Sequence, residues 1–272
     1  MAKARWLIVN LADSATISAS PALLSTAGET FLQRQGRETA RSTSTASQQI
    51  KLTWNGTTVS ATMVGEAFTN FTTGATRRVQ CHANADFTGS TVYDSTALAC
   101  WNYSGLPSWY DPTAVENRIR KNGAIYFPSV SFKSMTITYL DAPPEGYLDI
   151  ARMFVGSYFE FSEQFGNASG AQTPGTLTNK ARVLSGSSSA NKGANFFNMP
   201  FNHGFMNDTD MASVMPAADL LGTDRDCWFS LYAGDGNFKE MFHQGAFTMR
   251  EPTAAEVFEY RLSRGSFMFE GQ

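Results

Sequence analysis

The sequence predicts an all-β protein, and its composition and its turn residues both indicate this class. Phe is the commonest aromatic residue at 21, aromatic residues make up 13% of the chain, and only 17% of residues are charged. Strands are enriched in aromatic residues, while Ser, Thr and Gly favour the turns that join them. A chain of 272 residues has room for two hydrophobic cores, since domains run to roughly 100–200 residues. We therefore expect two domains, over residues 1–157 and 158–272.

The N-terminal region predicts two short strands and a long polar connection. Residues 6–9 form a short apolar run that predicts the first strand. Residues 16–19 predict the second strand, which is followed by Pro21. Residues 25–49 are rich in Gly, Ser and Thr and show little apolar periodicity. Such a stretch is typical of connecting loops.

The clearest strand signal surrounds the Asn55-Gly56 pair. Ile50, Leu52 and Trp54 alternate with polar residues before this pair, and residues 59–63 alternate after it. Asn-Gly tolerates the positive φ angles of a tight hairpin turn. The pattern predicts a β-hairpin.

Further strands are expected at residues 78–82, 135–139 and 147–156. The alternation of residues 135–139 is offset by one residue at Lys133-Ser134, which suits a β-bulge. A turn over residues 141–146 separates the last two strands, which we expect to pair in the middle of a sheet and to close the first domain.

The second half combines strands with one short helix. Residues 181–185 lead into a Gly/Ser/Asn-rich segment, 185–195, which is either a mobile loop or a hairpin arm. A helix is expected over residues 213–221, with Pro216 in its first turn and Gly222 after its end. Residues 227–232 read as a buried strand.

The C-terminus fits two structures. Residues 253–256 match a helix capping box, whereas Phe258, Tyr260 and Leu262 alternate as in a strand and precede a turn at Arg264-Gly265. We favour a hairpin over a helix here.

Charge and cysteine content exclude several classes of protein. The formal net charge is −3, the isoelectric point is near 5.7, and no Lys/Arg cluster matches a nucleic-acid backbone. The apolar run at residues 6–9 is too short for a spanning helix or a signal-peptide core, so we expect a soluble, cytosolic product. Cys81, Cys100 and Cys227 are unclustered and are expected as buried free thiols.

No motif with a known catalytic mechanism occurs, so we expect neither an enzyme nor a cofactor or metal site. The nearest alternative is His203 with Asp208 and Asp210, which could share a proton or hold a metal if the loop folded back. Asn, Asp and Gly are also turn formers, and a pair of Asp residues ordinarily caps a turn or a following helix.

Four large aromatic residues within ten positions form the most distinctive candidate contact site. They are separated by Gly105 and Pro107, which suggests a loop that presents flat apolar faces. Such a loop would stack on sugar rings, contact another subunit, or cover the core of its own domain. The four residues are Trp101, Tyr103, Trp109 and Tyr110.

The first half resembles the discoidin-like, galactose-binding-type β-sandwiches of tail-tip and baseplate proteins in long-tailed bacteriophages. The resemblance lies in residues 10–20, 48–54, 134–140 and 146–156. It implies a jelly-roll-type β-sandwich, while the layout of the second half is similar to the small β-barrel domain of tail-tube and distal-tail proteins.

This resemblance implies a structural component of a virion tail tip or baseplate, assembled in the host cytoplasm and acting through subunit interfaces. Its partners would be copies of itself in a hexameric or trimeric ring and other tail proteins, with residues 185–195 as an inter-subunit arm. The alternative function is a carbohydrate-binding module that recognises a receptor glycan on the host surface.

Overall fold

The computed structural model describes residues 3–24, 28–33, 39–44, 47–100, 122–162, 173–182, 188–206, 208–221, 225–233, 244–257 and 263–271. The chain divides into two compact units. The first contains residues 1–160 and 227–246, and the second contains residues 161–226 and 247–272. The sequence predicts a single boundary after residue 157. In the structure the first unit ends at residue 160 and also includes the later segment 227–246.

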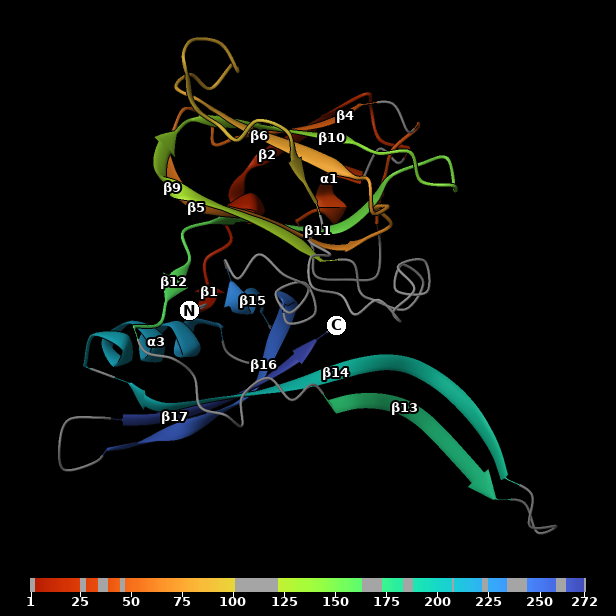
Figure 1. The fold of residues 1–272 in the computed structure, drawn as a ribbon, viewed down its shortest axis with the longest axis vertical. Coiled ribbons are helices and arrows are strands. Elements are labelled where there is room, and N and C mark those ends of the chain that lie inside the picture. Colours follow the sequence, from red (N-terminus) through yellow and green to blue (C-terminus); the bar gives the residue numbers. More distant parts are fainter. Residues whose placement is uncertain are drawn as a thin grey trace. The chain divides into compact units, whose positions relative to one another are not determined.

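Both units consist mainly of antiparallel strands, which confirms the predicted all-β class (Figure 1). The first unit is a β-sandwich of a six-stranded and a four-stranded sheet. The six-stranded sheet has the order β2 (Thr16–Ser20), β4 (Gln48–Thr53), β10 (Ser134–Leu140), β6 (Thr76–His82) and β7 (Thr91–Asp94), and β8 (Leu98–Ala99) also pairs with β6. The four-stranded sheet has the order β3 (Ala40–Arg41), β11 (Asp149–Gly156), β5 (Val59–Thr69) and β9 (Gly123–Phe132).

The apolar faces of the two sheets enclose one core. Alternate residues of a strand point to the same face, so Ile50 and Leu52 of β4 turn inward together. Val64 of β5 and Met153 of β11 meet them from the other sheet in the same buried cluster. Short elements border this core, namely the 3₁₀ helix η1 (Leu11–Ser14) and the helix α1 (Gly28–Phe31).

The predicted hairpin around Asn55-Gly56 is wrong, although the turn itself is present. Asn55 and Gly56 have φ angles of 52° and 83°, and the Thr57 N–H donates to the Trp54 carbonyl at 2.9 Å. The strands on either side, β4 and β5, belong to different sheets. The buried Trp54 ring packs edge-on against Phe132, 5.5 Å between ring centroids, where the chain leaves one sheet for the other.

A second crossing replaces the predicted bulge at Lys133-Ser134. β9 ends at Phe132 in the four-stranded sheet, and β10 begins at Ser134 in the six-stranded sheet. The Lys133 N–H donates to the His82 carbonyl at 3.0 Å and fixes this corner. The expected pairing of the last two strands is wrong for the same reason, because β10 and β11 lie in facing sheets.

Three further strands of the first unit border a second, smaller apolar cluster. β1 (Lys3–Leu7) pairs with β12 (Phe159–Glu160) on one side and with β15 (Asp226–Ala233) on the other. β15 contains the strand predicted at residues 227–232, and it supplies the fully buried Trp228. The Trp228 ring lies 5.5 Å from the Phe154 ring, centroid to centroid. This cluster lies on the outer side of β5 and β11, because it receives Met63 and Phe154 while Val64 and Met153 face the sandwich core.

The second unit contains long strands and one helix. In it β14 (Ser188–Met206) lies between β13 (Thr173–Arg182) and β17 (Ser263–Gly271), and β17 also pairs with β16 (Gln244–Val257). Because β14 begins at Ser188 and pairs with β13, residues 188–195 are part of a hairpin and not a loop, while residues 185–187 of the predicted segment lie outside the described residues. The strand order among the described residues is open at β13, so a closed barrel stays a prediction.

Two boundaries in this unit differ from the prediction. The helix α3 (Asp208–Leu221) begins five residues earlier than expected, so Pro216 lies inside the helix and not in its first turn. The helical alternative at the C-terminus is wrong, because residues 253–256 are strand, and β16 pairs with β17 as an antiparallel hairpin whose strands and turn differ from the predicted ones. Arg264 and Gly265 lie within β17, not in a turn, and residues 258–262 fall outside the described residues.

Candidate functional site

The aromatic loop predicted as a contact site, Trp101, Tyr103, Trp109 and Tyr110, lies outside the described residues. Its role therefore stays a prediction.

Of the three residues considered for proton transfer or metal binding, Asp210 has a clear structural role. Its buried carboxylate accepts a hydrogen bond from the Ser162 hydroxyl at 2.6 Å and another from the Ser162 N–H at 3.2 Å. Asp208 begins α3, and His203 lies in β14 opposite Gly265. Within the described ranges no three His, Cys, Asp or Glu side chains gather as a metal site would require.

His82 has a packing role, and the cysteines are buried free thiols as the sequence predicts. His82 is buried, its ring lies 3.5 Å from the Thr136 hydroxyl, and burial lowers its pKa. All three cysteines are free and buried, and burial raises the pKa of Cys81 and that of Cys100 to about 12. Thiols with such pKa values stay protonated and unreactive at neutral pH.

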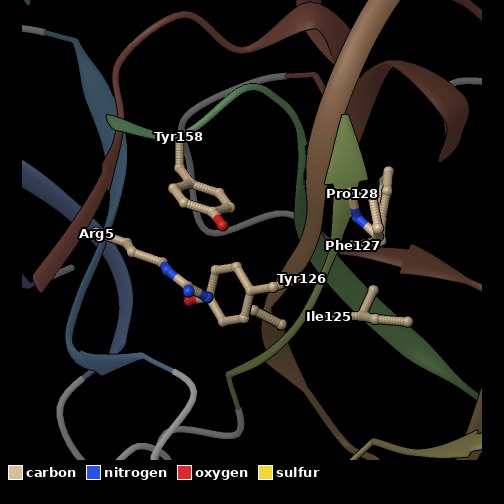
Figure 2. A pocket seen from close by; sticks show the side chains of 7 residues that line it. Arg5, Ile125, Tyr126, Phe127, Pro128 and Tyr158 are labelled. Atoms are coloured by element: carbon tan, nitrogen blue, oxygen red, sulfur yellow. The ribbon is translucent and has the colours of Figure 1, made fainter. Parts of the chain in front are cut away.

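An open pocket of about 550 Å³ in the first unit is the candidate site (Figure 2). One arginine and two tyrosine side chains dominate the pocket, and β9 supplies the other lining residues. The lining residues are Arg5, Ala124, Ile125, Tyr126, Phe127, Pro128 and Tyr158.

The Arg5 guanidinium contacts both tyrosine rings. Its central carbon is 4.5 Å from the centroid of the Tyr126 ring and 4.4 Å from that of the Tyr158 ring. The two rings are nearly perpendicular, with an interplanar angle of 89° and a centroid separation of 5.4 Å. Each contact is within the range of a cation–π attraction.

A carboxylate outside the pocket lining pairs with Arg5. The Arg5 Nε–H donates to Glu160 Oε2 at 2.7 Å, and this ion pair leaves the pocket without net charge. Arg5 and Glu160 are register partners across β1 and β12, so the antiparallel pairing itself places the two side chains together.

The backbone positions the three side chains firmly. Arg5 alternates along β1 with the buried Ala4 and Trp6, so it faces the opposite side of the strand from them. Tyr126 lies in β9 opposite Met63 of β5. The Tyr158 N–H donates to the Thr62 hydroxyl at 3.1 Å, which ties the segment after β11 to the same strand β5.

Sequence reasoning missed this pocket. Arg5, Tyr126 and Tyr158 come from three segments far apart in the chain, and no local motif joins them. The only sequence signal for this site is the alternation of polar and apolar residues around Arg5. This alternation predicts which face of the strand Arg5 lies on, but not which side chains lie next to it.

A similar arrangement elsewhere in the first unit lies outside the pocket. The Arg41 guanidinium stacks 3.8 Å from the centroid of the Tyr147 ring, and it donates two hydrogen bonds to Asp149, at 2.8 and 2.9 Å. These three residues give a matched reference for experiments on Arg5, Tyr158 and Glu160.

No protein-family model matches the sequence, and a search of curated proteins finds no match. Among solved structures, the module CpGH89CBM32-5 from Clostridium perfringens, in complex with GalNAc-β-1,3-galactose, is 12% identical with a TM-score of 0.38, over 54% of this chain and 99% of that one. Chitosan-binding module 1 of a chitosanase/glucanase from Paenibacillus sp. IK-5 is 16% identical with a TM-score of 0.37, over 54% and 98%. An F-type lectin (fucolectin) from striped bass serum is 9% identical with a TM-score of 0.37, over 71% and 68%.

The sandwich of the first unit has the form that the resemblance to discoidin-like modules implies, whereas the tail-tip assignment stays a prediction. No helix among the described residues is long and apolar enough to cross a membrane.

Proposed function

We propose that the first unit binds a carbohydrate and that the pocket around Arg5 holds it. The observation that carries this proposal is an open pocket of about 550 Å³ lined by a guanidinium that contacts two tyrosine rings and is paired with a neighbouring carboxylate. Pockets of roughly 300–1,000 Å³ are the size that small ligands occupy.

The chemistry of the pocket suits a sugar. A sugar ring has apolar C–H faces and a rim of hydroxyl groups, so it needs aromatic surface together with hydrogen-bond donors and acceptors. Tyr126 and Tyr158 offer ring surface, and Tyr158 adds a phenolic hydroxyl, whereas the Tyr126 hydroxyl is buried. The Arg5 guanidinium offers N–H donors in a fixed plane, and the Glu160 carboxylate offers acceptors, both as charge-assisted groups.

The charge balance points to a neutral sugar. The cation of Arg5 is already paired with Glu160, so a second carboxylate from an acidic sugar would compete with that ion pair. A neutral sugar would instead bridge the two groups through its hydroxyls. Binding to a neutral sugar should depend only weakly on salt concentration, because no charge is neutralised.

A glycan array with the whole chain, followed by calorimetric titration of the best ligand, tests the proposal. The Tyr158→Ala variant should lose binding, whereas Tyr158→Phe should retain most of it because the ring surface remains. Tyr147→Ala is the matched control, since Tyr147 contacts an arginine in the same way outside the pocket. Absence of any ligand on the array, or equal affinity of wild type and Tyr158→Ala, contradicts the proposal.

The structural role in a virion tail stays a prediction, because no described feature is specific to a virion.

A further inference from the structure

The pairing of β5 with β9 is interrupted beside the pocket. Regular pairing stops at Ala61 of β5 and resumes at Met63. The residue between them, Thr62, is opposite residues 127–129 of β9. Proline is tolerated inside strands at edges and bulges, so Pro128 favours an interruption at this place. A β-bulge of this kind bends a strand and redirects its side chains, and bulges are common next to functional sites.

The packing of β5 shows the same irregularity. Ala61 belongs to the sandwich core, whereas Met63 belongs to the smaller apolar cluster on the outer side of β5. Because Thr62 follows a core residue, its half-buried side chain faces outward too. Two successive residues, Thr62 and Met63, therefore face the side on which Tyr126 and Tyr158 pack against the smaller cluster.

The interrupted run of β9 forms one wall of the pocket. Phe127 and Pro128 line the pocket, and the ring of the preceding residue, Tyr126, contacts the Arg5 guanidinium. In Figure 2, Tyr126 and Pro128 come from one strand, whereas Tyr158 comes from a separate segment. The shape of this wall therefore depends on the bulge.

The segment that carries Tyr158 is held to β5 just beyond the end of their ladder. β11 pairs with β5 as far as Gly156. The next residue, Ser157, donates its hydroxyl to the Ser60 carbonyl at 3.2 Å. The Tyr158 N–H then donates to the Thr62 hydroxyl at 3.1 Å. The Thr62 hydroxyl thus fixes the backbone from which the Tyr158 ring projects toward the pocket.

The same segment also places the carboxylate that pairs with Arg5. Glu160 lies two residues after Tyr158, is the register partner of Arg5, and accepts its Nε–H at 2.7 Å. The Tyr158 ring centroid lies 4.4 Å from the guanidinium. A shift of this one segment would therefore disturb both contacts of Arg5.

We propose that Thr62 is a positioning residue of the carbohydrate pocket, an inference that rests on the proposed function. Its hydroxyl accepts the Tyr158 N–H and so holds the Tyr158 ring against Arg5. Valine has nearly the shape of threonine but no acceptor. In Thr62→Val the Tyr158 N–H loses its partner, and the segment shifts to reach water because an unpaired, partly buried donor is unfavourable.

Nuclear magnetic resonance of the isotope-labelled whole chain, without sugar, tests the positioning. In Thr62→Val the ring signals of Tyr158 should move, and cross-relaxation between the rings of Tyr126 and Tyr158, whose centroids are 5.4 Å apart, should weaken. Thr62→Ser keeps the hydroxyl and should restore both, while the signals of Tyr147 stay fixed in every variant. Unchanged Tyr158 signals in Thr62→Val overturn the inference.

Calorimetric titration with the best neutral glycan tests the consequence for binding. Thr62→Val should bind about fivefold more weakly, as expected for one lost hydrogen bond, and Thr62→Ser should bind like the wild type. Ser60→Ala is the matched control, because the Ser60 hydroxyl is hydrogen-bonded at 2.8 Å to that of Ser131, which does not line the pocket. This control should keep the wild-type affinity. Wild-type affinity in Thr62→Val overturns the inference.

Thermal denaturation of the same variants separates positioning from stability. A lower melting temperature in Thr62→Val, with the Tyr158 signals and the affinity unchanged, would mean that the hydroxyl serves the fold alone, which contradicts the inference. If the wild type binds no glycan and Thr62→Val still moves the Tyr158 ring, the carbohydrate function fails, whereas the hold of Thr62 on Tyr158 is supported. The two failures are therefore distinguishable.

Discussion

Glu66 and Arg77 form an ion pair inside the sandwich, from β5 of one sheet to β6 of the other. Both side chains are almost fully buried, at 1% and 2% exposed. The Tyr139 hydroxyl donates to the second oxygen of Glu66 at 2.9 Å, so a third strand joins the same cluster. The cluster links the two sheets through their core, with the carboxylate held by two donors.

Removing one member of this pair should cost more stability than removing both. Glu66→Leu or Arg77→Met alone leaves a buried charge without its partner, which typically costs about 3–5 kcal/mol. The double variant replaces both charges with apolar groups of similar size and should recover most of the loss. Urea denaturation of the two single variants and the double variant measures the coupling. Additive losses in the double variant would contradict a direct ion pair.

The ion pair between Arg78 and Asp94 predicts a pH dependence of stability. Hydrogen bonds from the Arg78 guanidinium lower the pKa of Asp94 to about 2. The unfolded pKa is about 3.9, so Asp94 stabilises the folded state above that pH, and the contribution is lost as the pH falls towards 2. In urea denaturation at a series of pH values, Asp94→Asn should flatten the decline across this window. The exposed turn residue Glu145 gives the control Glu145→Gln, and an identical decline in wild type and Asp94→Asn would refute the assignment.

Gly65 should tolerate no larger residue. A Cβ atom at this position would lie 3.0–3.2 Å from three ring atoms of Trp228, which is itself fully buried. Gly65→Ala forces the ring to shift, and overpacking of this kind costs about 1–3 kcal/mol. Gly74→Ala is the control, because its nearest neighbour would be 3.7 Å away, and its effect should stay within about 0.5 kcal/mol. Thermal denaturation of both variants provides the comparison, and equal melting temperatures would contradict the packing.

Alternation along the strands predicted which residues face the core, but it did not predict which strands pair. Ile50, Leu52, Met135 and Ile137 are buried as expected. In a sandwich, however, two consecutive strands with the same alternation can lie in one sheet or in facing sheets, and the sequence around Asn55-Gly56 is compatible with both. Trp54 packs against Phe132, a residue far away in the sequence, where the chain crosses from one sheet to the other, so the two strands lie in facing sheets.

The candidate site was less predictable than the fold, for a related reason. The aromatic cluster at residues 101–110 is conspicuous because its members are close in sequence, and it lies outside the described residues. Arg5, Tyr126 and Tyr158 approach one another through the pairing of β1 with β12, the pairing of β5 with β9 and the hydrogen bond between Tyr158 and Thr62. Contacts of this kind depend on tertiary structure, which periodicity does not encode.

The central claim, that the first unit holds a sugar beside Arg5, is tested most directly by the ring signals of tyrosine in nuclear magnetic resonance. During titration of the isotope-labelled chain with its best neutral glycan, signals of Tyr126 and Tyr158 should shift with one common dissociation constant, while those of Tyr139 and Tyr147 stay fixed. Shifts confined to Trp101, Tyr103, Trp109 and Tyr110 would place the sugar on the aromatic loop and contradict the pocket.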